Sequence, residues 1–295
     1  MTRLRDWWRP AHAPGVQMAL TLAAIVLLLR PMGPWYVQAP LLFIGALAIV
    51  RPETARVPGL WLAAALAIGA RLVVEWPLPD NHIYLTAYWC LAAALALHGQ
   101  EPEAHLATAS RLLLALAMTL AVLWKALLSP DYLDQRFFRV TLIEDPRFAS
   151  VSMLAGGLTD AQLEENRAAL APLPAGAELL DPPILREPRR LRVLAAGLTW
   201  GGVGLEALLA LVLWVPGRRA RPWQHALLLI FCLVTYAVAP VAGFGWLLLI
   251  MGLCLCRPDQ HALRATYVAT FFVVLLVTEI PWATVLLHAW RTVAG

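Results

Sequence analysis

The stretch LATASRLLLALAMTLAVLWKALL, from Leu106 to Leu128, decides the class of this protein. It is mostly apolar, with one arginine near its start and one lysine near its end. A helix that crosses a bilayer needs about 20 consecutive, mostly apolar residues. The stretch is therefore predicted to be a transmembrane helix.

The whole composition has the same character. Hydrophobic residues make up 60% of the 295 residues, charged residues make up 14%, and the mean hydropathy is +0.67. Soluble domains are about 45–50% apolar and about 25% charged, so the composition excludes a soluble enzyme, a disordered chain and a coiled coil. The net charge of +4 does not indicate nucleic-acid binding, because the basic residues stand at the ends of apolar runs rather than on a solvated face.

We predict an all-α, polytopic transmembrane helical bundle of about nine spans, with a mostly helical extramembrane insertion. Residues 1–128 would form five N-terminal membrane helices, 129–191 the insertion, and 192–295 four C-terminal membrane helices. The basic, tryptophan-rich segment 1–10 is predicted to be an interfacial anchor and not a cleaved signal peptide. The predicted spans are 14–30, 35–50, 57–75, 82–98, 106–128, 192–215, 223–239, 241–256 and 265–289.

The arginines predict the orientation of these spans. With the N-terminus in the cytoplasm, eleven arginines fall in inner segments, whereas only Arg30 and Arg291 fall in short outer ones. Because cytoplasmic loops carry the excess of basic residues, we predict a multi-pass protein of the cell inner membrane. Residues 129–191 would then be periplasmic.

The insertion carries its own helix signals. Thr159-Asp-Ala-Gln162 matches a capping box, which predicts a helix that begins there and ends near Ala171. The mixed apolar and basic stretch from Tyr132 to Ile143 predicts a second helix, lying on the membrane surface.

Ionisable residues within spans cost free energy, so each is a candidate functional residue. Arg71 and Glu75 are four residues apart and are predicted to pair. Glu206 is predicted to pair with an arginine or to stay protonated. The other candidates map, like Arg71 and Glu75, to the outer half of the membrane; they are Asp80, His82, Lys125, Glu279 and His288. Snorkelling or wet interfacial side chains are the structural alternative for this group.

Sites of other kinds are not predicted. The chain contains no phosphate loop, no metalloprotease or haem motif and no zinc spacing. Its four cysteines lie inside apolar runs and are interpreted as small core residues, so no metal is expected.

The segment WKALLSPDYL, from Trp124 to Leu133, resembles a segment of the HTTM (horizontally transferred transmembrane) domain class, which includes the vitamin K-dependent gamma-carboxylases. The similarity extends to Glu206, to PGRR at 216–219 followed by His225, and to FGW at 244–246. DoxX-like membrane proteins share the same general helical pattern. The resemblance implies a helical bundle with an outward-facing pocket, in which Lys125 occupies the position of the lysine that acts as base on reduced vitamin K.

Two hypotheses for function follow. In the first, the protein is a quinone- or lipid-linked enzyme or redox module that uses Lys125 as base, with Glu279, Glu75 or Asp80 orienting it or exchanging protons. In the second, it is a non-catalytic membrane subunit that binds a protein partner or membrane lipid through residues 129–191. A transporter is less favoured, because no inverted repeat with paired broken helices is visible.

Overall fold

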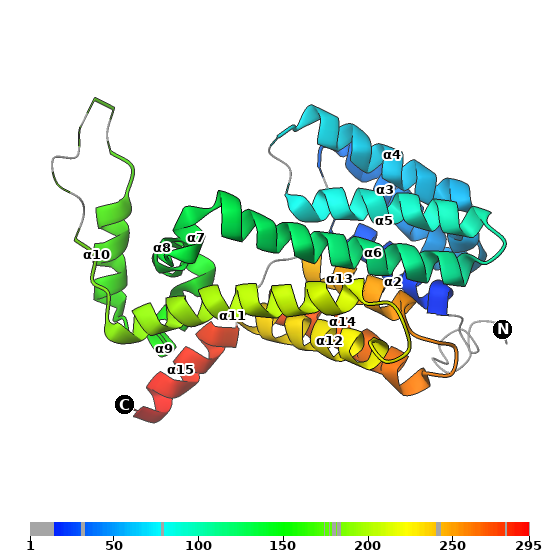
Figure 1. Cartoon of the computed structure of the whole chain (residues 1–295). Coiled ribbons are helices and arrows are strands. Elements are labelled where there is room, and N and C mark those ends of the chain that lie inside the picture. Colours follow the sequence, from blue (N-terminus) through cyan, green and yellow to red (C-terminus); the bar gives the residue numbers. More distant parts are fainter. Residues whose placement is uncertain are drawn as a thin grey trace. The chain divides into compact units, whose positions relative to one another are not determined.

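The computed structural model describes residues 15–30, 33–77, 80–173, 175–176, 178, 181, 184–239, 243–280 and 282–294. Throughout these residues the secondary structure is helical and no strand occurs, which confirms the predicted all-α class (Figure 1). The predicted interfacial anchor at 1–10 lies outside this part of the chain.

The N-terminal helices follow the predicted runs closely. Proline at or next to the first position begins three of the helical segments here, where its missing N–H and fixed φ are harmless. The helices are α2 (Gly15–Leu29), α3 (Trp35–Val50), α4 (Pro58–Val74), α5 (Asn81–His98) and α6 (Pro102–Leu123), with the 3-10 turn η1 (Pro52–Arg56) before α4 and the π-helical turn η2 (Trp124–Leu128) after α6.

The insertion forms several short helices instead of one long surface helix at 132–143. Gln135 has a φ of +72°, which breaks the helical path. Leu142 and Ile143 are fully buried, which corrects the prediction of a single amphipathic helix. The elements are α7 (Pro130–Leu133), α8 (Arg136–Glu144), η3 (Pro146–Phe148), α9 (Ala149–Leu154) and α10 (Asp160–Leu170).

The C-terminal region differs from the prediction at its end. The predicted span 265–289 is two helices, because the first ends at Glu279 and the second begins at Trp282. The sequence between them contains Pro281, and a proline disfavours helix at the preceding residue. The elements are α11 (Arg189–Trp214), α12 (Arg221–Val238), α13 (Phe244–Cys254), α14 (His261–Glu279) and α15 (Trp282–Ala294).

Three described helical stretches are long and apolar enough to cross a membrane, namely Pro102–Leu128, Arg189–Trp214 and His261–Thr278. The nine predicted spans are therefore not confirmed. Within the predicted eighth span, the described helix α13 has 11 residues, a length of about 16 Å against a hydrocarbon core of about 30 Å. Since ten of its residues are buried, it is a core helix of the bundle.

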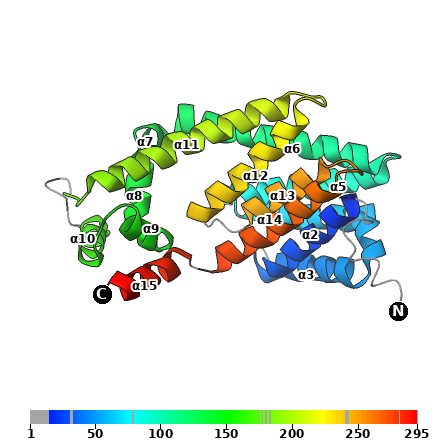
Figure 2. The same cartoon turned by 90° about the horizontal axis from the view of Figure 1, so that it is seen from below.

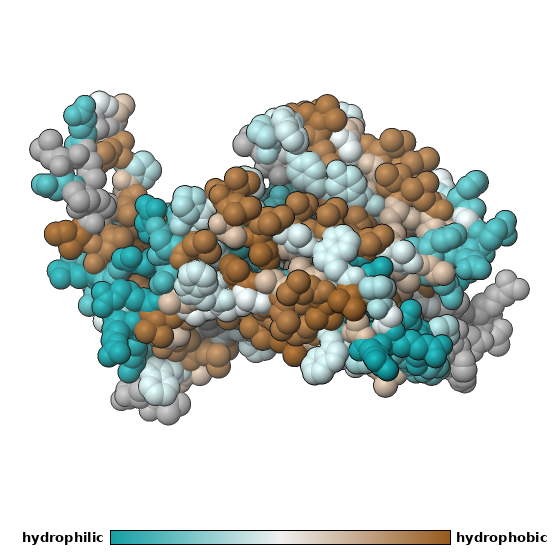
Figure 3. Space-filling view, viewed as in Figure 1, coloured by the Kyte–Doolittle hydropathy of each residue, from teal (hydrophilic) through white to brown (hydrophobic). Residues whose placement is uncertain are grey.

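Large apolar side chains are also exposed to an extent that suits lipid contact. Leu66, Leu95, Val193 and Leu211 are each more than 60% exposed. Figure 3 shows broad apolar areas on the face that it displays. Exposed apolar surface of this kind marks membrane or partner contact, so it agrees with membrane association.

The chain divides into two compact units. The first comprises Met1–Met118, Leu209–Leu233 and Val241–Leu276. Within it, α13 packs against α2 (Figure 2), and Trp61 of α4 meets Trp89 of α5 edge to face at 5.6 Å. The predicted division at residues 128 and 191 is a different partition of the chain and stays a prediction.

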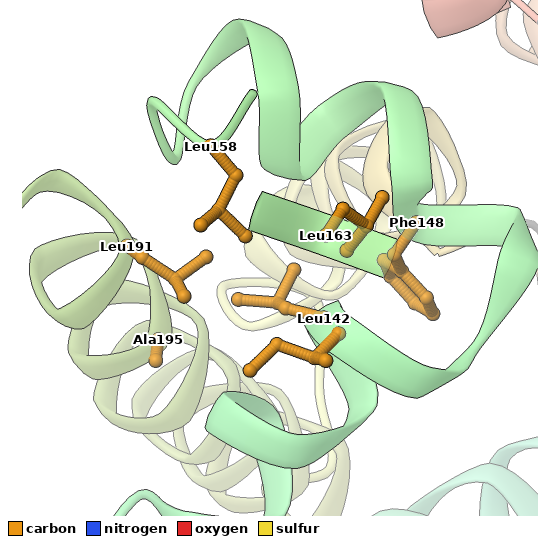
Figure 4. Close-up of a cluster of buried hydrophobic side chains, with 7 residues drawn as sticks. Leu142, Phe148, Leu158, Leu163, Leu191 and Ala195 are labelled. Atoms are coloured by element: carbon orange, nitrogen blue, oxygen red, sulfur yellow. The ribbon is translucent and has the colours of Figure 1, made fainter. Parts of the chain in front are cut away.

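The second unit comprises Thr119–Leu208, Val234–Pro240 and Val277–Gly295, and it contains the insertion. Its core joins the insertion to the start of α11, as Figure 4 shows. The Asn166 side chain accepts from the Arg186 backbone N–H at 2.7 Å and donates to its carbonyl at 2.9 Å, which fixes the segment before α11 to α10. The capping box of Thr159 and Gln162 is present as predicted. The core residues are Leu142, Ile143, Phe148, Leu158, Leu163, Leu191 and Ala195.

Candidate functional site

Lys125 lies in the π-helical turn that ends α6. The turn, Trp124–Leu128, widens the helix just before Ser129 and Pro130 stop it. π-helical turns are rare and occur frequently at functional sites. Lys125 is the second residue of this irregular turn.

The amine of Lys125 is held by Glu206 of α11. Its Nζ donates to both carboxylate oxygens, at 2.5 Å to Oε1 and 2.6 Å to Oε2. The lysine and glutamate side chains are 20% and 12% exposed, so the pair is largely shielded from solvent. Both residues belong to the second unit, although 81 residues separate them in the chain.

Tyr132 of α7 forms the third part of this site. The Lys125 Nζ lies 5.0 Å from the centroid of the Tyr132 ring, which is the geometry of a cation–π contact. The ring also packs against Phe137 at 5.3 Å and Phe138 at 5.6 Å. Burial, and secondarily the negative charge of Glu206, raise the pKa of Tyr132, so the phenol stays neutral at physiological pH.

Gly202, one helical turn before Glu206, lies beside this phenol. A Cβ at Gly202 would lie 3.5 Å from the Tyr132 hydroxyl, in ordinary contact. An alanine would therefore also fit here, and the distance shows only that this face of α11 lies beside Tyr132.

The partner of Glu206 corrects the sequence analysis. Glu206 is paired, as one prediction required, but with Lys125 and not with an arginine. The expectation arose because each residue was considered on its own helix, and sequence spacing does not show which helices face each other. The sequence did contain a signal for this pair. One predicted span carries a lysine and another carries a deeply placed glutamate, and these opposite charges could have been predicted to pair.

The structure also locates the other predicted residues. Arg71 and Glu75 form the predicted ion pair at 2.8 Å. Asp80 is the exposed N-cap residue of α5, and His82, the second residue of that helix, is half-buried beside Gly243. These four residues belong to the first unit.

The two remaining candidates belong to the second unit. Glu279 is the last residue of α14, and its side chain lies outside the described structure, as does Pro281. His288 is exposed on α15 and contacts the Thr284 carbonyl at 3.0 Å. The predicted convergence of Glu279, Asp80 and His82 on Lys125 stays a prediction.

Two contributors were missed by the sequence analysis. The π-helical turn has no sequence signature, and Tyr132 was assigned to a surface helix. The aromatic residue seven positions after the lysine was a usable signal, since Ser129 and Pro130 force a turn between them.

Among the described residues, no group of three or more histidine, cysteine or acidic side chains is placed to hold a metal ion. All four cysteines are free thiols; Cys90, Cys232 and Cys254 are buried, as predicted for core residues, whereas Cys256 is half-buried.

Comparison with known proteins gives no match to this chain, whether to a family model, to a characterised sequence or to a solved structure. The resemblance to the HTTM class therefore rests on the sequence motifs alone. What the chain does has to be argued from its own residues.

Proposed function

We propose that the chain is an integral inner-membrane protein of the HTTM-like class whose Lys125–Glu206 pair is an acid/base site for a lipid-soluble quinone or hydroquinone. Its N-terminus would be cytoplasmic and residues 129–191 periplasmic. The observation that carries the proposal is that the only lysine among 23 basic residues is hydrogen-bonded to both oxygens of a shielded carboxylate. The other 22 are arginines, which cannot lose a proton in a protein. Among the lysine and arginine residues, only Lys125 can therefore lose its proton and become a base.

The chemistry needs one internal proton transfer. A shielded ion pair can exchange its proton along an existing hydrogen bond, because low polarity lessens the advantage of the charged forms. When the proton moves from the Lys125 Nζ to a Glu206 oxygen, the amine becomes neutral and can accept a proton from a ligand hydroxyl. Glu206 then holds the first proton, and Lys125 is again an ammonium beside the negative charge of the ligand.

The surroundings suit an aromatic, lipid-soluble ligand. Tyr132, Phe137 and Phe138 form an aromatic cluster directly beside the amine. Trp124 and Leu127 of the same π-helical turn are 61% and 72% exposed, so exposed apolar side chains stand next to Lys125 in the turn. The hydroquinone form of such a ligand would supply the acidic hydroxyl, and these residues would orient its ring.

The test uses a lipid-soluble naphthohydroquinone, kept anaerobic, whose ionised form absorbs at longer wavelength than its neutral form. Full-length protein in detergent is titrated with this probe, and the ionised fraction of the bound probe is followed against pH. The wild type is expected to hold the probe ionised at lower pH than solution does. Lys125→Met removes the base, and Lys125→Arg keeps the charge and the ion pair but removes the base.

The control variant, Arg218→Gln, removes a positive charge from an exposed loop in the first unit. It is expected to behave as the wild type does. If wild type binds no probe, or if Lys125→Arg ionises it equally well, the acid/base proposal is wrong.

A second candidate function is that of a non-catalytic subunit that binds a partner through residues 129–191. It is favoured by the buried core of this insertion, which is more than a connecting loop requires. On this hypothesis Lys125→Arg should be silent, because arginine preserves the pair with Glu206. Leu142→Ala should instead abolish partner binding, because it leaves a cavity in the core of the insertion.

A further inference from the structure

A shallow groove lies where α9 ends and α11 begins, within the second unit. It has a volume of about 530 Å³ and is lined by Ala155, Arg189, Arg190, Val193 and Leu194. Three of these five side chains are apolar, and the other two are arginines in the first turn of α11. The groove therefore combines a cationic end with an apolar floor.

The two arginines are not neutralised by the protein. Both are exposed, and in the described part of the chain no carboxylate pairs with either of them. The neighbouring arginines differ, since Arg139 pairs with Glu187 and Arg186 with Glu165. The two guanidinium groups are thus available to a ligand of negative charge.

The groove continues into an exposed apolar track along α11. Val193, Trp200 and Leu208 are 63%, 54% and 48% exposed, and their spacing of seven and eight residues places them on one helix face. Gly197 and Gly204 lie between them on that face, with open space where a side chain would stand. From Val193 to Leu208 the track is about 22 Å long, enough to reach through one leaflet of about 15 Å.

We infer that this groove binds an anionic phospholipid, with its phosphate on Arg189 and Arg190 and one acyl chain along α11. Guanidinium groups bind phosphate oxygens in paired, charge-assisted hydrogen bonds. The apolar track favours a lipid over a soluble anion, which would leave it uncovered. The inference rests on insertion of α11 into a membrane, one element of the proposed function, and does not depend on chemistry at Lys125.

The experiment measures lipid retained by delipidated, full-length protein in neutral detergent. The protein is titrated with phosphatidylglycerol or phosphatidylcholine, and bound lipid is counted by native mass spectrometry. Two variants alter the site: Arg189→Gln with Arg190→Gln removes the charge, and Ala155→Trp fills the groove. Both changes are at exposed positions, so they should not disturb the fold. The matched control is Arg218→Gln with Arg219→Gln, which removes the same charge from another exposed pair.

Wild type and the control pair are expected to prefer phosphatidylglycerol, and both site variants should lose that preference by about tenfold or more. Equal preference in the Arg189/Arg190 variant and the wild type would overturn the inference, as would an equal loss in the control pair. Inorganic phosphate that displaces the lipid at a similar concentration would show a soluble-anion site and not a lipid site. Failure of the lipid site would leave the Lys125 titration unchanged, so the two proposals fail separately.

Discussion

Replacing Glu206 perturbs the site most directly, and two substitutions separate charge from hydrogen bonding. Glu206→Leu leaves the Lys125 ammonium without its carboxylate while it remains largely shielded. Removing one partner of a buried ion pair costs about 3–5 kcal/mol. Because the lysine side chain is 20% exposed and can turn partly toward water, we expect the lower end, about 3 kcal/mol. Glu206→Gln retains an acceptor, and we expect it to cost about 1 kcal/mol.

The assay is thermal and denaturant unfolding of purified protein in one detergent, with a double-substitution cycle. A loss of about 3 kcal/mol corresponds to roughly 5 °C in Tm for a chain of this size. Lys125→Met combined with Glu206→Leu should be less destabilised than the sum of the single variants, with a coupling of about 2 kcal/mol, because an apolar pair replaces the ion pair. Equal stability of the Leu and Gln variants, or additive losses in the cycle, would refute the shielded ion pair.

Three further outcomes are expected. Reporter fusions after Ala175 and Gly217 should lie on opposite sides of the membrane, and the same side for both would contradict the predicted topology. Asn166→Ala should destabilise the insertion by about 1–3 kcal/mol and expose the segment at Arg186 to limited proteolysis, since both its backbone groups lose a partner. Tyr132 has a raised pKa in the folded state, so its contribution to stability is complete below about pH 10 and falls as the pH rises further; unfolding of Tyr132→Phe, measured from pH 8 to 11, should lack this loss.

The helix positions were predictable from the sequence because they depend on local signals. The run from Leu106 to Leu128 lies within the observed stretch 102–128, and its end is set by Ser129 and Pro130. The capping box at Thr159 likewise begins a helix at Asp160. Each of these features depends on residues within four positions of each other, where sequence and backbone are directly linked.

The number of membrane spans was not predictable from apolarity alone. An apolar run can face lipid or it can be buried in protein, and α13 takes the second course. The next predicted span, 265–289, is not one helix but two, which are separated near Ile280. The first case depends on tertiary packing and the second on a single proline. An average of hydropathy over a window of residues detects neither.

The Lys125–Glu206 pair links the segments of chain on either side of the insertion. Lys125 stands where the chain leaves α6, and Glu206 lies on α11 after the chain has returned. The hydrophobic core of the insertion packs against α11 separately, at Ala195. This residue is 11 positions, or about 16 Å, from Glu206 along the helix. The chain thus contacts α11 at two points, an ionic one just before the insertion and an apolar one within it. A structural clamp at the second point would be served at least as well by arginine, whose planar fork matches a carboxylate. A purely structural role does not explain why lysine is used at position 125. This is the reason to test the Lys125–Glu206 pair for proton exchange.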